Sequence, residues 1–300
     1  MDLLSLVYSL RPLPVSGPLT NPPGWWGRAA HALVLNTIRE VDENLAASLH
    51  VISGESDEKS SESHNPVRPF SASTLMGHFN KGTPNPQETY SLRLTAFRED
   101  VAAILDAASS TGSLAPARTI ELDYQPFEIL AVGQAAGGPG DGSSPWAARN
   151  SYQELSAPYL LGRVAAPRHI NLQFTSPTTF KSQGKHMPFP LPGLVFGSLL
   201  ERWNAYAPIN FPPEVRRYAE ECLAISQFDL ETRPVPQKSR GVRMGAVGRV
   251  TYVTVNYDRY WMSLLSTLAA FSLYSGVGAG TSQGMGQCRC LPGSNRPQVE

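Results

Sequence analysis

The chain has 300 residues, enough for one large or two ordinary domains with a substantial core. Its 25 basic and 25 acidic residues give a formal net charge of zero, which argues against a protein that coats nucleic acid without selectivity. Three cysteines without a CxxC pair argue against a disulfide framework and against a zinc site of standard spacing. Because no apolar run reaches about eighteen residues and the N-terminus does not resemble a secretory signal, we expect a cytoplasmic protein without membrane contact.

The first half of the chain predicts the order strand, helix, strand, strand, helix, strand. Alternating apolar residues predict a strand over 4–10, and apolar residues at helical spacing predict one helix over 26–48. Further along, the patterns predict strands over 70–78 and 90–95, a helix over 101–108 and one strand over 119–132. The glycine-rich segment 133–144 is expected to be a loop or the boundary between two halves.

The same order recurs in the second half. Strands are expected over 169–174, 223–230, 244–255 and 286–290, and helices over 194–204 and 260–274. Two βαββαβ units predict an α+β fold of two tandem ferredoxin-like domains, the topology of RNA-recognition modules, over 1–145 and 146–300.

A dense glycine segment lies between the last predicted helix and the last predicted strand. Five glycines fall within eleven residues, 276–286. The segment is neither a Walker A loop, which ends in Gly-Lys-Ser/Thr, nor a dinucleotide fingerprint, which follows a strand and opens a helix. Either the glycines only turn the chain, or their amides bind phosphate. On the second interpretation the candidate RNA-binding residues are Gly276, Gly278, Gly280, Ser282, Gln283, Gly284 and Gly286.

Segments 245–252 and 274–287 together closely resemble the C-terminal signature of the CRISPR-associated endoribonucleases that cut repeat transcripts into guide RNAs, the sixth Cas family. Segments 169–178 and 196–204 are similar to that family's central part, and 45–50 and 68–73 to its N-terminal part. The resemblance implies the same duplicated ferredoxin-like fold. It also implies cleavage by the RNA's own 2′-hydroxyl, without metal or cofactor, leaving a 2′,3′-cyclic phosphate and a 5′-hydroxyl.

Such a reaction needs a general base, a general acid and a cation near the phosphate, and histidine suits both proton transfers. The resemblance places a catalytic histidine at His50, which could otherwise only cap a helix. His31 lies nineteen residues earlier, about 28 Å away along an unbroken helix. The pair can therefore cooperate only if the helix breaks, for which the segment 42–44 is the candidate. Arg28 is the candidate cation.

RNA contacts are expected from basic residues that the zero net charge conceals. Between 233 and 249 the chain carries no acidic residue but five basic ones: Arg233, Lys238, Arg240, Arg243 and Arg249. Either they lie on a solvated sheet edge, or they form a surface that binds RNA phosphates. Further candidates are Arg168, His169, Lys181 and Lys185.

The expected partner is CRISPR repeat RNA, as a stem-loop or an unstructured repeat, with other interference-complex subunits as further partners and a monomer or homodimer as the oligomeric state. One alternative is an RNA-binding scaffold of an interference complex that cuts weakly or not at all. Another is a nucleotide-binding protein that uses the glycine segment for phosphate.

Overall fold

The computed structural model describes residues 1–15, 23–51, 67–80, 82–133, 144–237 and 241–292. The chain folds into two compact units. Unit 1 comprises Met1–Tyr152, Val235–Arg243 and Gly280–Met285, and unit 2 comprises Gln153–Pro234, Met244–Ala279 and Gly286–Glu300. The tip of the glycine segment therefore belongs to unit 1, although its two ends belong to unit 2.

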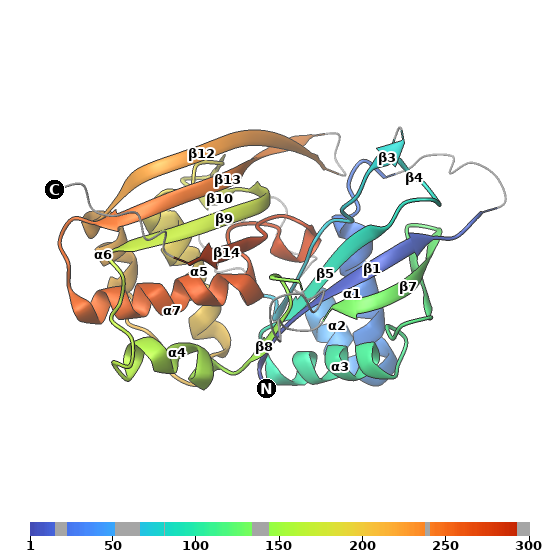
Figure 1. Ribbon diagram of the computed structural model, residues 1–300, viewed down its shortest axis with the longest axis horizontal. Coiled ribbons are helices and arrows are strands. Elements are labelled where there is room, and N and C mark those ends of the chain that lie inside the picture. The colour runs from blue at the N-terminus through green and yellow to red at the C-terminus, as the bar shows by residue number, and fades with distance from the viewer. Residues whose placement is uncertain (16–22, 52–66, 81, 134–143, 238–240, 293–300) are drawn as a thin grey trace. The chain divides into compact units, whose positions relative to one another are not determined.

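Unit 1 is built on an antiparallel sheet whose central strand is β1 (Leu3–Pro12). The strands follow the order β2-β5-β1-β7-β6, so β1 lies between β5 and β7, as Figure 1 shows. The other strands are β2 (Phe70–Ala72), β5 (Tyr90–Ala96), β6 (Thr119–Leu122) and β7 (Gln125–Gly133), with β8 (Ala148–Asn150) paired to β1 and a small ribbon of β3 (Phe79–Asn80) and β4 (Thr83–Pro84).

Three helices accompany this sheet: α1 (Gly27–Val41), α2 (Glu43–Val51) and α3 (Glu99–Ser110). Alternate residues of β1, among them Leu4, Leu6 and Tyr8, are buried against the apolar stripe of α1, which includes Val34 and Ile38. Removing this apolar surface from water is the main force that holds the helices to the sheet.

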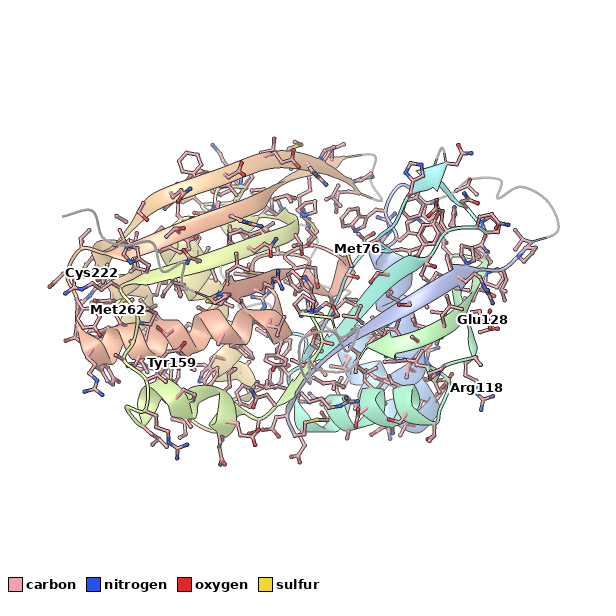
Figure 2. All side chains as sticks on the ribbon, viewed as in Figure 1. Met76, Arg118, Glu128, Tyr159, Cys222 and Met262 are labelled. Atoms are coloured by element: carbon pink, nitrogen blue, oxygen red, sulfur yellow. The ribbon has the colours of Figure 1, made fainter. Side chains whose placement is uncertain are left out.

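Unit 2 repeats the plan with a sheet of order β12-β13-β9-β14. Its strands are β9 (His169–Thr178), β12 (Leu223–Pro236), β13 (Val242–Thr254) and β14 (Cys288–Leu291), and a separate ribbon joins β10 (Phe180–Ser182) to β11 (Lys185–Met187). Its helices are α4 (Tyr152–Leu160), α5 (Pro192–Tyr206), α6 (Glu214–Cys222) and α7 (Arg259–Ser275). Figure 2 shows the side chains of both units, including the buried Met262 of α7.

The predicted pair of ferredoxin-like folds is confirmed. In each unit the four main strands follow the spatial order second, third, first, fourth, with helices after the first and third strands. No helix among the described residues is long and apolar enough to cross a membrane.

Some predicted elements were wrong in detail. The single strand over 119–132 is the hairpin β6–β7, because Asp123 and Tyr124 both adopt positive φ and reverse the chain. Helices α4 and α6, the ribbon β10–β11 and the short 3₁₀ helix η1 (Thr281–Gln283) were not predicted. The predicted helix over 26–48 is two helices, and this break shapes the candidate site.

Candidate active site

The break between α1 and α2 is produced by Asp42. Its backbone is extended (φ −144°, ψ 99°), and its amide donates to Ile38 O and so ends α1. Its carboxylate then accepts the amide of Leu45 at 2.8 Å and begins α2, a typical use of aspartate at a helix N-terminus. The helix break that cooperation of His31 and His50 requires is therefore present.

His31 lies on α1, half-buried, with its ring stacked on Phe70 at 5.4 Å between centroids. Its Nδ1 atom is shielded from solvent and has no hydrogen-bond partner in the part of the chain that the structure describes. Burial, with a contribution from the positive charge of Arg68, lowers the pKa of His31 to about 4, although a hydrogen bond to the Ser282 backbone opposes the shift. At neutral pH the imidazole is uncharged and can accept a proton.

His50 is exposed in the last turn of α2. Its charge contributes, as the smallest of the causes, to the lowered pKa of His31, so the two rings lie within electrostatic range. Because α1 ends at Asp42, the two histidines do not lie on one continuous helix that would hold them far apart.

The tip of the glycine segment completes this group in unit 1. Arg68 Nη1 donates to Ser282 Oγ at 2.9 Å, and Trp25 Nε1 donates to Gln283 O at 2.6 Å. Gly284 has φ +96°, and a Cβ there would come 3.0 Å from Gly27 Cα, so the tip packs against the start of α1. Arg68 was not among the predicted site residues, because nothing in its local sequence points to a partner more than two hundred positions away.

Most amides of the glycine segment are already occupied. Hydrogen bonds to protein acceptors are made by the amides of Gly276, Val277, Gly278, Ala279, Gln283, Met285, Gly286 and Gln287. The amides of Gly276, Gly278, Gln283 and Gly286 are therefore not bare, and contact of these residues with RNA stays a prediction. Gly280 accepts two of these bonds through its carbonyl, so much of the segment is folded onto the protein.

Arg28, the candidate cation, lies at the start of α1, where its Nη1 donates to the backbone carbonyl of Pro236 at 3.3 Å. Pro236 ends β12 and belongs to unit 1 with Arg243, which is half-exposed at the start of β13. Lys238 and Arg240 lie outside the described residues. Within the described ranges, no three His, Cys, Asp or Glu side chains are grouped in a way that could hold a metal ion.

The remaining predicted RNA-binding residues belong to unit 2, most of them exposed. Arg168 stacks over the Tyr257 ring at 4.8 Å, and His169 is the exposed first residue of β9. Lys181 and Lys185 are exposed on the ribbon β10–β11. Arg233 pairs with Glu231, just outside the segment that lacks acidic residues, so its charge is partly neutralised.

Arg249 stands in a row of polar side chains across three strands of unit 2. It lies opposite Gln173 of β9, which in turn lies opposite Arg289 of β14. Arg289 Nε donates to Gln173 Oε1 at 2.9 Å. Desolvation first, and the nearby charge of Arg249 second, lower the pKa of Arg289. Arg249 and Arg289 thus place two positive charges close together. Arg289 was not predicted from the sequence, because only the pairing of β14 and β13 with β9 brings it near Arg249.

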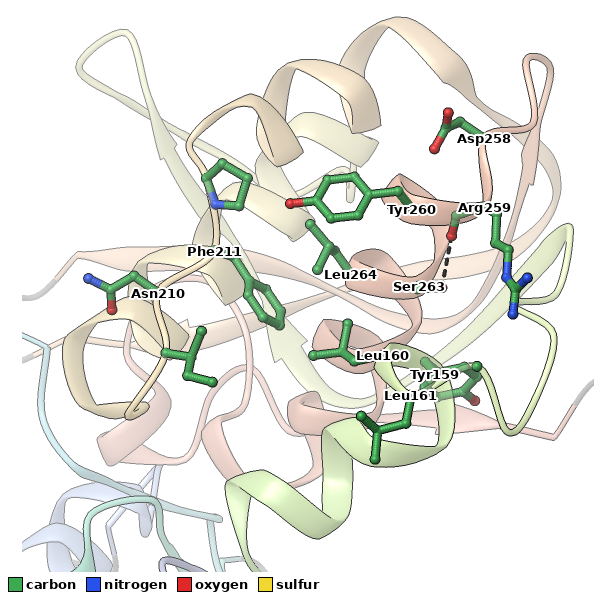
Figure 3. A pocket seen from close by; sticks show the side chains of 13 residues that line it. Tyr159, Leu160, Leu161, Asn210, Phe211, Asp258, Arg259, Tyr260, Ser263 and Leu264 are labelled. Carbon is green, nitrogen blue, oxygen red and sulfur yellow. Dashed lines mark hydrogen bonds between the residues drawn. The ribbon is translucent and has the colours of Figure 1, made fainter.

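Unit 2 also holds an open cavity of about 830 Å³ between α4, the α5–α6 connection and the start of α7 (Figure 3). It is lined largely by apolar side chains such as Ile209, Phe211 and Leu264. None of the predicted site residues lines it. The cavity is therefore separate from the candidate active site.

Comparisons with known proteins bear on the family and the fold. The family model described as CRISPR-associated endoribonuclease Cas6 matches residues 172–288. A solved Cas6 structure, titled as a product complex, superposes with a TM-score of 0.71 at 25% identity, covering 97% of this chain and 100% of its own. A substrate-mimic complex of the same protein gives a TM-score of 0.67 at 27% identity, with 96% and 99% covered.

The chain thus matches the Cas6 family model over residues 172–288 and resembles solved Cas6 structures over nearly its whole length. Two curated relatives carry the name CRISPR-associated endoribonuclease Cas6. The one from Mycobacterium tuberculosis is 29% identical over 126 residues, and the one from Streptococcus thermophilus is 31% identical over 144 residues. These matches cover 42% and 45% of this chain, and only 40% and 56% of the relatives' own lengths. The curated Cas6 matches are thus partial, whereas the structural likeness extends over nearly the whole chain.

Proposed function

We propose that this chain is a Cas6-type, metal-independent endoribonuclease that binds CRISPR repeat RNA and cuts precursor transcripts into guide RNAs. The observation that carries the proposal is the group in unit 1 formed by an uncharged His31, the Arg68–Ser282 contact and the nearby His50. The names of the curated relatives support the endoribonuclease class.

In the proposed reaction, His31 accepts the proton of the 2′-hydroxyl, whose oxygen attacks the adjacent phosphorus. The bond from phosphorus to the 5′-oxygen breaks, and His50 donates a proton to that oxygen. The products are a 2′,3′-cyclic phosphate and a 5′-hydroxyl. We assign the base to His31 because its ring is neutral at pH 7, the form a general base needs, although a pKa of about 4 makes it a weaker base than an ordinary histidine.

Arg68 and Arg28 are the cations in this scheme. Arg68 lies within electrostatic range of His31 and is fixed by Ser282 Oγ, so its charge has a defined place. Arg28 lies on α1 three residues before His31. A fixed positive charge stabilises the charge that develops on the phosphate oxygens in the transition state.

Binding of the repeat is assigned to exposed basic residues rather than to the glycine amides. In unit 2 these are Arg168, His169, Lys181, Lys185 and Arg249, together with the half-buried Arg289. Arginine side chains close together attract the RNA backbone and make binding sensitive to salt. We also expect the chain to be a monomer or homodimer and to contact other subunits of a CRISPR interference complex.

The test is incubation of the full chain with end-labelled repeat RNA in EDTA, with products examined by mass spectrometry. We expect one cut per repeat, with a 2′,3′-cyclic phosphate on the upstream fragment and a 5′-hydroxyl on the downstream one. Stable binding without product would instead favour the scaffold alternative. Cleavage that requires added metal, or a 5′-phosphate product, would contradict the proposed chemistry.

A further inference from the structure

Arg202 of α5 contacts the first part of the glycine segment within unit 2. Its Nη2 donates to the carbonyl of Gly278 at 2.6 Å. Its Nη1 donates to Ser198, to the hydroxyl oxygen at 2.6 Å and to the backbone carbonyl at 3.1 Å. Since Ser198 and Arg202 are four residues apart on one helix, both side chains lie on the same helix face.

Ser198 also makes a hydrogen bond to the backbone of Gly278. Its Oγ accepts the amide of Gly278 at 2.9 Å, so the N–H of Gly278 is held by Ser198 and its C=O by Arg202. Gly278 has φ +77°, and a Cβ there would lie 2.4 Å from Thr179 O. The chain thus enters the segment through a conformation that only glycine adopts easily and that two side chains hold in place.

The chemical choice of arginine here is costly for stability alone. The Nε atom of Arg202 is shielded from solvent, and burial lowers the pKa of its guanidinium to about 10. The group stays charged at neutral pH, which the nearby charge of Glu201 favours, and the hydrogen bonds given above go to uncharged oxygens. Replacing a buried charge by a well-packed apolar side chain often leaves stability unchanged or raises it. The presence of arginine is better explained by a need for a planar group that donates to Ser198 and to Gly278 at the same time.

We propose that Arg202 is a positioning residue of the candidate active site. By fixing the peptide of Gly278, it sets the path of the chain into Gly280, Thr281 and Ser282. Ser282 is the residue that meets Arg68 and His31 in unit 1. The kinetic part of this inference rests on the proposed function, whereas the structural part does not.

The structural part is tested on the free protein by following the His31 ring through a pH titration by NMR, with Arg68 and His50 unchanged as its charged neighbours. In Arg202→Met, Ser282 should lose its fixed place and with it the backbone hydrogen bond that opposes the lowering of the His31 pKa, so the His31 midpoint should fall further below an ordinary histidine value. Gly278→Ala should have the same effect from the other side of the contact. Ser198→Ala, which removes a single hydroxyl, supplies a milder variant if Arg202→Met fails to fold.

The kinetic part is tested by single-turnover cleavage alongside RNA affinity. Arg202→Met should slow cleavage by about tenfold to a hundredfold while affinity changes little, because a displaced catalytic group affects rate more than binding. Arg202→Lys keeps the charge but lacks the planar fork, so it should share the defect.

The matched control is Arg217→Met on α6, which removes an exposed arginine paired with Glu221 and should alter neither readout. A His31 midpoint equal to the wild-type value in folded Arg202→Met, or in Ser198→Ala and Gly278→Ala, would overturn the proposal. If wild-type protein does not cleave RNA, the proposed function fails but the NMR result still decides the positioning role.

Discussion

Arg68 Nη1 donates to Ser282 Oγ at 2.9 Å, although 214 positions separate the two residues in sequence. Both residues influence the pKa of His31. Arg68 precedes β2, and Ser282 lies in the short helix η1 at the tip of the glycine segment. One partner supplies a fixed positive charge and the other a backbone hydrogen bond to the His31 ring. The proposed chemistry therefore depends on the glycine segment for the geometry of a histidine.

The first prediction concerns the two histidines. His31→Ala and His50→Ala should each slow single-turnover cleavage by about two to four orders of magnitude, the usual effect of losing a general acid or base. RNA affinity should stay nearly unchanged, since neither ring is assigned to RNA binding. Quenched-flow cleavage together with filter binding measures both quantities. His78→Ala, which removes an exposed histidine of the same unit, is the control, and equal rates for all three variants would contradict the assignment.

The second prediction follows from the pKa of His31. The folded value, about 4, is below the ordinary 6.5, so the folded protein favours the neutral ring and the unfolded chain takes up the proton first. The resulting stability is complete above the ordinary value and is lost as pH falls toward about 4. At pH 5 the loss should reach about 2 kcal/mol relative to pH 8. Urea unfolding of wild type and His31→Gln measures it, and parallel pH curves for the two proteins would exclude the lowered pKa.

The third prediction concerns Arg68. Arg68→Gln removes a positive charge that lowers the pKa of His31 and also the donor to Ser282, so the His31 pKa should rise. Cleavage at neutral pH should slow by about tenfold or more, because transition-state stabilisation by a fixed charge is lost. An NMR titration and a rate measurement on the same sample test both effects. Arg118→Gln, at an exposed arginine of the same unit, serves as the control; unchanged values in Arg68→Gln would remove Arg68 from the site.

The fourth prediction concerns RNA binding by unit 2. Arg249→Gln and Arg289→Gln should each weaken repeat binding and reduce the slope of log affinity against log salt by about one. Arg233→Gln should have a smaller effect, because Glu231 already neutralises part of its charge. Titrations at several salt concentrations distinguish these cases. If Arg233→Gln proved the most damaging of the three, the binding surface would lie on β12 instead.

The sequence predicted the features that local pattern controls. Strand, helix and cap signals each lie within a few residues of the sequence. The sequence therefore predicted the alternation in β1, the apolar stripe of α1 and the possible break near Asp42. The order of elements then led to the duplicated ferredoxin-like fold.

Contacts between residues far apart in the chain could not be predicted from the sequence. The predicted phosphate cradle came from counting glycines, but distant partners such as Ser198, 80 positions from Gly278, and Thr179 accept the amides. Arg68 and Arg289 likewise become interesting only through Ser282 and Arg249, which the fold brings beside them. A glycine-rich pattern predicts a tight turn, and the distant partners decide whether its amides stay open.

The most direct test of the central claim uses repeat RNA with a single 2′-deoxynucleotide immediately upstream of the cut. If the RNA's own 2′-hydroxyl is the nucleophile, this substrate should bind with the affinity of the unmodified repeat and yield no product, since the attacking oxygen is missing. Cleavage of the modified RNA at the unmodified rate would show that water or another nucleophile attacks, and would contradict the mechanism assigned to His31.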